Sequence, residues 1–150
     1  MYLNAHSWFS FKHGVLKPEV LLEEAAKAGV RTLAITDIHC SAGIPDFVRD
    51  APRFGVRPVA GIEFRQGVRL LYIGIAKSNV GFQRLNELLS PHLLDGEAIP
   101  TRAPELEDVF FIYPFVHAPQ HLRPNERVGI KPGELTRLPF SPWARRVNDL

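Results

Sequence analysis

The sequence predicts an α/β fold in which parallel strands form a sheet or a barrel, and two observations support this. Three short apolar segments, 2–5, 32–36 and 56–64, alternate with two segments of helical periodicity. The order strand–helix–strand–helix–strand is typical of parallel α/β structures. In addition, the 150 residues are 45% hydrophobic and 23% charged, an ordinary globular composition that excludes disorder for most of the chain.

Both predicted helices carry start or stop signals. The first is expected to begin at Pro18, because proline suits a first helical turn, and to end at Gly29. Its buried stripe has helical spacing and consists of Leu21, Leu22, Ala25 and Ala28. The second helix is expected to end at Pro52 and Gly55, and its stripe consists of Ile44, Phe47, Val48 and Ala51.

A fourth strand, 70–76, follows a predicted tight turn at Gln66 and Gly67. Ser78 is expected to cap the next helix. The buried face of that helix is predicted to consist of Phe82, Leu85, Leu88 and Leu89.

The second half of the chain differs in composition, because nine of the 13 prolines lie after residue 89. Residues 91–107 are polar and rich in turn formers, which predicts a long surface loop. Strands are predicted at 109–113 and, more weakly, at 128–130, with one or two helical turns at 132–138. A last strand begins at 147–150 without a terminating signal, so we expect the chain to be cut from a longer one.

Composition also excludes several classes of protein. The 18 Lys and Arg residues nearly balance the 16 Asp and Glu residues, so the net charge of +2 gives no global signature of nucleic-acid binding. The longest apolar runs are far shorter than the roughly 18 residues that span a bilayer. The only cysteine, Cys40, excludes an internal disulfide, and no signal peptide begins the chain. A cytoplasmic protein without membrane contact is expected.

Three predicted strands end in side chains that bind metals. His6 follows the first strand, Asp37 ends the second and Glu63 ends the third. The carboxyl ends of parallel strands meet at one edge, so these residues are expected to converge. Imidazole and carboxylate suit Zn, Mn or Fe, and two such ions held together would favour phosphoester hydrolysis.

The same residues also fit structural roles. Asp37 and Ser7 suit the capping of a following turn, His6 suits a barrel rim, and Glu63 suits an ion pair with Arg65. Of the other histidines, His39 lies close enough to Asp37 to add support for a site. The remaining three are expected to be solvated surface residues: His92, His117 and His121. No phosphate-binding glycine motif is present.

Four segments resemble the PHP domain (polymerase and histidinol phosphatase). Residues 4–14 are similar to its HxHSxxSxxDG opening, 34–47 to ALTDHxxxxGxxxF and 55–63 to GIKPIIGxE. Residues 70–85 resemble the LLAKNxxGYxxL segment of the PHP domain that begins the alpha subunit of bacterial C-family DNA polymerase, the DNA polymerase III type. Residues 113–115 and 129–135 are similar to variant forms from Bacteroidetes-like bacteria.

Departures from the family pattern weaken its metal site. Asn4 stands where the family has its first histidine, His13 replaces an aspartate, and Ile38 replaces the histidine after the Thr-Asp pair. The resemblance therefore implies a vestigial site of His6, Asp37 and Glu63 that holds no metal or binds Zn or Mn weakly. No catalytic residue is expected in this chain.

The resemblance implies a PHP-like (βα) barrel that is incomplete in this chain. Residues 1–150 would be its N-terminal part, with the βα units in 1–90 and a proline-rich, loop-rich remainder in 91–150. The aromatic stretch 110–115 is expected to need partners for burial. Whether the parent polymerase is replicative or error-prone stays open.

Three functions are consistent with these patterns. The first is a structural domain of a DNA polymerase III alpha subunit, a DNA-directed DNA polymerase, with the rest of that subunit as its partner and with replication proteins and DNA reached through the parent protein. The second is a metal-dependent phosphoesterase or exonuclease of the PHP superfamily. The third is an unrelated α/β binding module.

Overall fold

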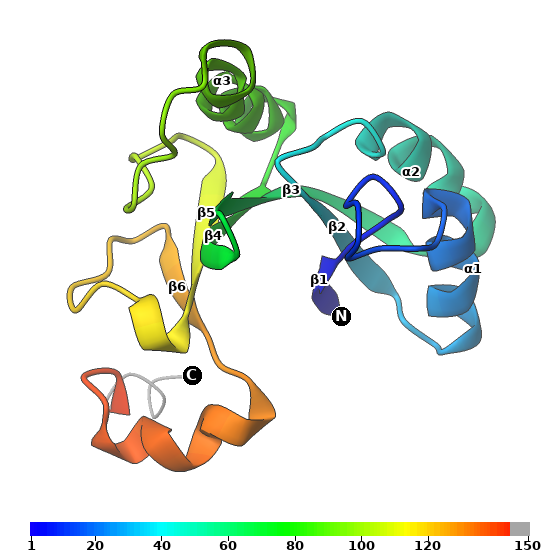
Figure 1. The fold of residues 1–150 in the computed structure, drawn as a ribbon. Helices are drawn as coiled ribbons and strands as arrows, with labels where there is room; N and C mark the ends of the chain where they lie inside the picture. Colours follow the sequence, from blue (N-terminus) through cyan, green and yellow to red (C-terminus); the bar gives the residue numbers. More distant parts are fainter. Residues whose placement is uncertain (145–150) are drawn as a thin grey trace.

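A computed structural model describes residues 1–144. In this part of the chain six strands form one sheet, and three α-helices pack on it (Figure 1). The strands are β1 (Tyr2–Ala5), β2 (Thr32–Ile38), β3 (Arg57–Gln66), β4 (Arg69–Ala76), β5 (Val109–Pro114) and β6 (Glu126–Gly129). The helices are α1 (Pro18–Lys27), α2 (Ile44–Asp50) and α3 (Asn79–Asp95), with 3-10 segments η1 (Ala51–Phe54), η2 (Phe115–His117) and η3 (Pro132–Phe140).

The sheet is mixed and curls into a half-barrel. Strands β1, β2 and β3 are parallel, as predicted, but β4 is antiparallel to both β3 and β5, and β6 is parallel to β5. The expectation of an all-parallel sheet is wrong beyond β3. A tight turn at Gly67, which has a left-handed φ of 59°, joins β3 to β4, and such a turn can only connect antiparallel neighbours.

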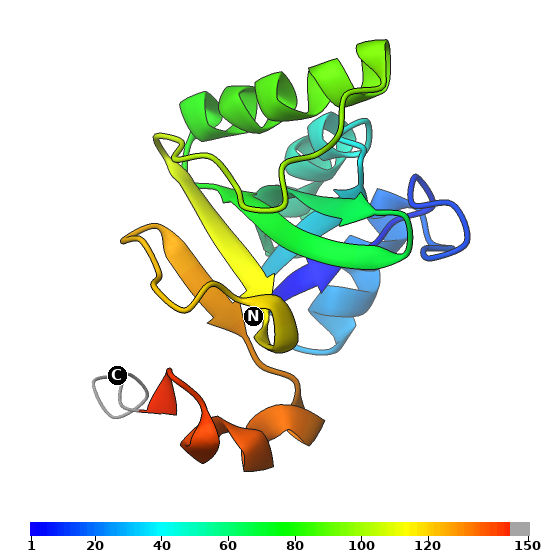
Figure 2. The same cartoon turned by 60° about the vertical axis from the view of Figure 1, so that its left-hand side comes forward.

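Helices cover the outer face of the half-barrel. Alternate residues of β2 face opposite sides of the sheet, so Leu33 and Ile35 pack with α1 and α2, whereas Ala34 lies on the inner face with Ile73 and Ile75. Helix α3 covers β4 and β5 (Figure 2), and its Phe82 also packs against the core that α1 and α2 share with β2. Within residues 1–144 no α-helix covers the inner face, which is largely apolar between β1 and β5.

Helix α3 begins as predicted and ends later. The Ser78 hydroxyl accepts a hydrogen bond from the N–H of Gly81 at 3.3 Å, which confirms the cap. The helix continues through Pro91 to Asp95, so the surface loop expected from Pro91 begins only at Gly96. Gly96 has a φ of 72°, and this left-handed cap, rather than the proline, ends the helix.

The aromatic residues of β5 are buried within this chain. Phe111, Tyr113 and Phe115 are at most 7% exposed. Phe111 and Tyr113 share the outer face of β5 with the core beneath α3, where Ile99 from the following segment also packs. The expectation that this stretch needs outside partners is therefore wrong for these three side chains: the segment between α3 and β5 folds back over Phe111 and Tyr113, and Phe115 packs against Trp143 with 5.4 Å between the ring centroids.

A buried carboxylate holds the second half together. Glu126 on β6 accepts hydrogen bonds from Arg102 Nη2 at 2.8 Å, from the backbone N–H of Arg123 at 2.8 Å and from the Tyr113 hydroxyl at 3.1 Å. Burial alone would raise the pKa of Glu126, but these hydrogen bonds outweigh burial and hold the pKa below its usual range. Glu126 thus joins two loops to the sheet.

The remaining predicted elements agree in type. The weak strand expected at 128–130 lies at Glu126–Gly129, and the helical turns expected at 132–138 form η3. The strand expected at 147–150 lies outside the described residues. No helix within residues 1–144 is long and apolar enough to cross a membrane.

Candidate functional site at the strand ends

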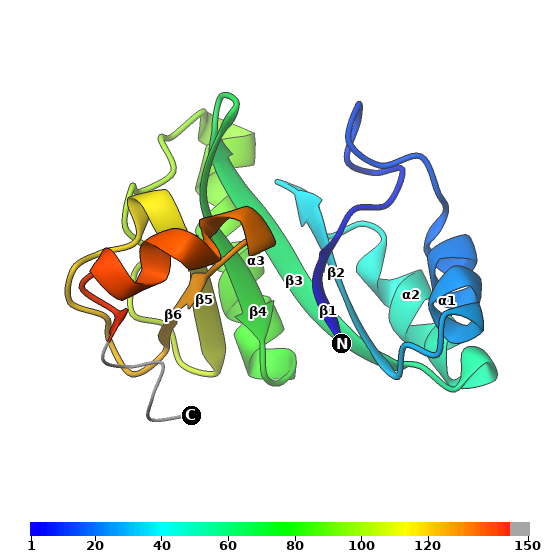
Figure 3. The same cartoon turned by 90° about the horizontal axis from the view of Figure 1, so that it is seen from below.

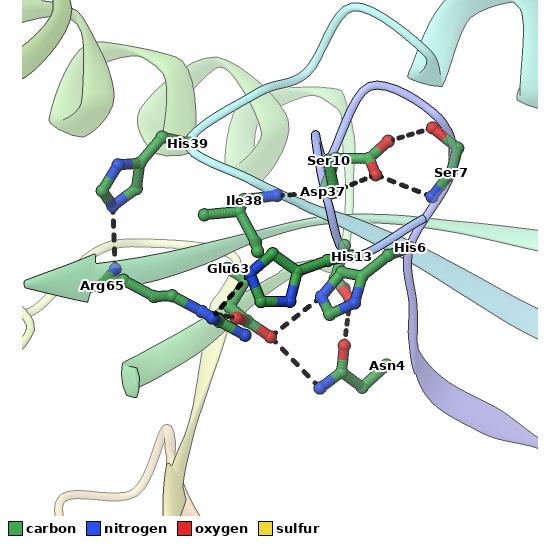
Figure 4. Close-up of polar contacts among 11 residues, drawn as sticks. Asn4, His6, Ser7, Ser10, His13, Asp37, Ile38, His39, Glu63 and Arg65 are labelled. Carbon is green, nitrogen blue, oxygen red and sulfur yellow. Dashed lines mark hydrogen bonds and ion pairs between the residues drawn. The ribbon is translucent and has the colours of Figure 1, made fainter. Parts of the chain in front are cut away.

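The predicted site residues lie where β1, β2 and β3 end (Figure 4). His6 follows β1 directly, Asp37 is the penultimate residue of β2, and Glu63 lies in β3 opposite the end of β2. Parallel pairing of the three strands brings these ends to one edge of the half-barrel. The residues nevertheless form two separate hydrogen-bond networks.

Glu63 is the centre of the first network. Its side chain is 1% exposed, and its Oε2 atom lies 3.0 Å from His6 Nε2 and 3.2 Å from Asn4 Nδ2. Arg65 donates from Nε to Oε1 of the same carboxylate. Glu63 and Arg65 are two residues apart on one strand, so their side chains share one face of the sheet. The structure therefore contains the Glu63–Arg65 ion pair that the sequence allowed as an alternative.

The charge of Glu63 is matched inside the protein. Burial alone would raise its pKa, but hydrogen bonds from His6 and Arg65 outweigh burial and hold the pKa of Glu63 below its usual range. The carboxylate is thus ionised at neutral pH, with the Arg65 guanidinium as its permanent counter-ion. His13 approaches the other side of this guanidinium, with Nε2 at 3.3 Å from Arg65 Nη1.

Asp37 belongs to the second network and faces the other side of the sheet. It pairs in register with Ile62, whereas Ile38 pairs with Glu63. Asp37 is 1% exposed and accepts three hydrogen bonds: from the N–H of Ser7 at 2.7 Å, the Ser7 hydroxyl at 2.6 Å and the Ser10 hydroxyl at 2.5 Å. These contacts fix the turn after β1, so Asp37 stabilises a preceding loop rather than the following turn or helix that the sequence suggested.

The histidines divide between these networks and the surface. His39 turns away from Glu63 and lies against His92, with 4.7 Å between the ring centroids. His92 was expected in a solvated loop, but it lies in α3 and is half-buried, because the helix extends far enough to bring it to His39. His117 and His121 are exposed, as expected.

The residues as arranged do not fit a metal centre. In residues 1–144 no group of three or more His, Cys, Asp or Glu side chains comes together as a metal would require. Asn4 directs its amide N–H₂ at Glu63, while its Oδ1 accepts a hydrogen bond from Thr36 at 2.9 Å. A cation at Glu63 would have to displace Arg65. Asp37 is already saturated by serine donors and points to the opposite face.

Comparison with known proteins defines the family. The model of the PHP domain matches residues 3–112, and the chain belongs to this family. It is homologous to a region of bacterial DNA polymerases: it is 35% identical over 106 residues to the error-prone DNA polymerase of Mycobacterium bovis, and 32% identical over 102 residues to DNA polymerase III subunit alpha of Vibrio cholerae.

These matches cover 63% and 64% of this chain but 10% and 9% of the relatives, so the chain spans about a tenth of their length. Two solved structures are also similar. One, described as a metal-dependent phosphoesterase from Bifidobacterium adolescentis, has a TM-score of 0.47 and 19% identity over 59% of this chain and 32% of its own. The other, an amidohydrolase from Chromobacterium violaceum, has a TM-score of 0.46 and 25% identity over 61% and 34%.

Proposed function

We propose that this chain is the N-terminal part of the PHP domain of a bacterial C-family DNA polymerase alpha subunit and that its role there is structural. Its homologues are DNA polymerases, and it spans about a tenth of their length. One observation carries the structural part of the proposal: the guanidinium of Arg65 pairs with the carboxylate of Glu63, the only acidic side chain bonded to His6 in the described chain.

Metal-assisted hydrolysis of a phosphoester would need cations that bind water and substrate oxygen atoms. Here the positive charge next to Glu63 belongs to the guanidinium of Arg65, which cannot coordinate a water molecule or a substrate as a metal ion does. Arg65 can hold the strand ends together, but it cannot lower the pKa of a bound water as a metal ion does. The positive charge of Arg65 therefore stabilises the buried Glu63 carboxylate and takes no part in hydrolysis.

The physical role we propose is that of a scaffold for the polymerase body. The inner face of the half-barrel is apolar across four strands and is formed chiefly by Leu3, Val59, Ile75, Phe110 and Ile112. An apolar face of this kind favours contact with further protein. In the parent polymerase, the segments that follow this chain would cover it.

The test combines metal content with activity. We expect the purified chain, dialysed against Zn²⁺ or Mn²⁺, to hold no stoichiometric metal, and to show neither phosphatase nor 3′-exonuclease turnover above background. His6→Ala and Asp37→Ala should leave that background unchanged. Metal-dependent turnover that both substitutions abolish would instead establish the chain as a metal-dependent phosphoesterase.

The polymerase parent is tested separately. An antibody raised against this chain should detect, in extracts of the source cells, a polypeptide many times longer than 150 residues. That polypeptide, isolated on the antibody, should extend a primed DNA template. A native product no longer than this chain would contradict the polymerase assignment.

A further inference from the structure

The connection between β1 and α1 exposes aromatic and aliphatic side chains at the strand-end edge of the protein. We call residues 7–17 the aromatic loop. Trp8 is 48% exposed, Phe11 83% and Val15 87%. The loop projects beyond the ends of β1 and α1 into solvent (Figure 3). Large apolar side chains gathered on one projecting loop indicate a contact surface.

The backbone of the aromatic loop is fixed. Asp37 holds its first turn through the hydrogen bonds of Ser7 and Ser10, and the N–H of Trp8 donates to the carbonyl of Leu16 at 2.9 Å. A Cβ atom at Gly14 would lie 1.9 Å from the carbonyl oxygen of Ser7, so the two arms of the loop touch at a position that only glycine permits. The aromatic side chains are thus displayed by a preformed scaffold, which reduces the entropy lost on binding.

The positive charge of the aromatic loop indicates which kind of partner it can bind. No Asp or Glu occurs in residues 1–18, whereas Lys12 and Lys17 lie within the loop. Lys17 Nζ lies 4.9 Å from the centroid of the Trp8 ring, and Lys12 Nζ lies 5.8 Å from that of Phe11. The two most exposed apolar rings of the loop, Trp8 and Phe11, therefore each have an ammonium group beside them. The matching partner must bring anionic groups and flat apolar surfaces together.

We propose that the aromatic loop binds single-stranded DNA. Every nucleotide carries one base and one phosphate, so two neighbouring nucleotides match the two pairs of ring and ammonium. Aromatic side chains stack on bases without regard to sequence, and lysines neutralise the phosphates between them. An acidic peptide offers the anions without a regularly placed flat group. The nearly balanced net charge of +2 makes this a local contact with few phosphates.

This contact goes beyond the proposed structural role, because it assigns an interaction to the chain itself. It also gives Asp37 a purpose that needs no metal: the carboxylate positions the loop. Within the loop His13 approaches Arg65, but the groups proposed to bind DNA are Trp8, Phe11, Lys12 and Lys17, so a failure of the non-catalytic proposal would leave the site intact.

The experiment measures the fluorescence anisotropy of a labelled oligothymidine with the whole chain, at low salt and with EDTA present. Trp8→Ala and Phe11→Ala are each expected to weaken binding by about tenfold. Lys12→Gln and Lys17→Gln should each lower the slope of log K against log salt by about 0.7. Phe140→Ala, which truncates a 91% exposed ring on η3, and Arg31→Gln are the matched controls and should change neither quantity.

Circular dichroism and thermal melting verify that each variant folds. The proposal is overturned if oligothymidine does not bind, or if the loop variants lose no more affinity than Phe140→Ala. Binding to anionic phospholipid vesicles or to polyglutamate without binding to oligothymidine would assign the loop to another partner and would equally overturn it. Because EDTA is present throughout, metal-dependent phosphoesterase activity cannot produce or mask the result.

Discussion

The Nε2 atom of His39 accepts a hydrogen bond from the backbone N–H of Arg65 at 2.8 Å. His39 follows β2 in a left-handed conformation, with φ of 48°, and this turns its ring toward β3 and α3. A nitrogen that accepts this bond carries no proton, so the imidazole is neutral in the folded protein. Burial, and next the charge of His92, lower the pKa of His39 below its usual value.

We therefore predict that acidification weakens the fold first through His39. An unfolded histidine titrates near about 6.5, and the folded pKa is lower, so between the two values the unfolded state binds more protons. The contribution of His39 is complete above about 6.5 and declines as the pH falls through this window. The charged or titratable groups around its ring are His92, Glu63 and Arg65. Urea unfolding at a series of pH values measures the slope.

His39→Asn is the informative variant for this prediction. Asparagine tolerates the left-handed backbone but cannot titrate. The variant should be less stable at neutral pH and nearly independent of pH in the window below about 6.5. An unchanged slope would show that another group is responsible.

Arg65→Ala is predicted to destabilise the protein by about 3–5 kcal/mol, because it leaves the Glu63 carboxylate buried and unpaired. The control is Arg49→Ala, which removes a side chain that is 67% exposed and pairs with Asp46 and Asp50, and it should cost about 0–1 kcal/mol. Chemical denaturation of both variants makes the comparison. Equal costs would show that the Glu63–Arg65 pair contributes no more than a surface pair.

Metal removal is predicted to have no effect on stability. A bound ion that favours the folded state raises the melting temperature by mass action, so the melting temperature should be the same in EDTA, Zn²⁺ or Mn²⁺. Asp37→Asn should cost about 1–3 kcal/mol by leaving serine donors unsatisfied, with or without EDTA. Asp46→Asn is the exposed control. A metal-induced rise that Asp37→Asn abolishes would contradict the misfit between these residues and a metal.

Glu126→Gln is predicted to loosen the second half of the chain. The amide cannot accept all the donors now directed at Glu126, so the loss should be about 1–3 kcal/mol. Limited proteolysis should then cut within residues 97–107, near Arg102, earlier than in the parent chain. Glu105→Gln changes an exposed carboxylate in the same segment and serves as the control. Equal cleavage of the two variants would refute this role.

The sequence predicted the first three strands and the helices between them because their signals are local. Apolar periodicity, Pro18 and the glycines after the helices act over a few residues. The position of Asp37 was also predictable in part: it alternates with Leu33 and Ile35, which face the helices, so strand alternation alone places it opposite the face of Glu63. The separation of Asp37 from the hydrogen-bond network of Glu63 follows from that alternation.

Other features depend on contacts that no local pattern contains. Glu126 lies 24 residues from Arg102, and only the folded chain brings them together. The proline at 91 suggested a helix end, but the tertiary packing of α3 on β4 and β5 overrides it. Burial of Phe111 and Tyr113 likewise required the return of the segment that contains Ile99.

Each strand of the sheet lies beside the strand that directly precedes it in the chain, from β1 to β6. As the protein is synthesised, every new strand can therefore pair at once with a strand already made, without waiting for a distant partner. The antiparallel β3–β4 pair, joined by the tight turn at Gly67, closes the shortest loop and therefore costs the least loop-closure entropy. At each stage of translation one edge of the sheet is the strand made last. The other edge is always β1, whose four residues leave only a short template for aggregation.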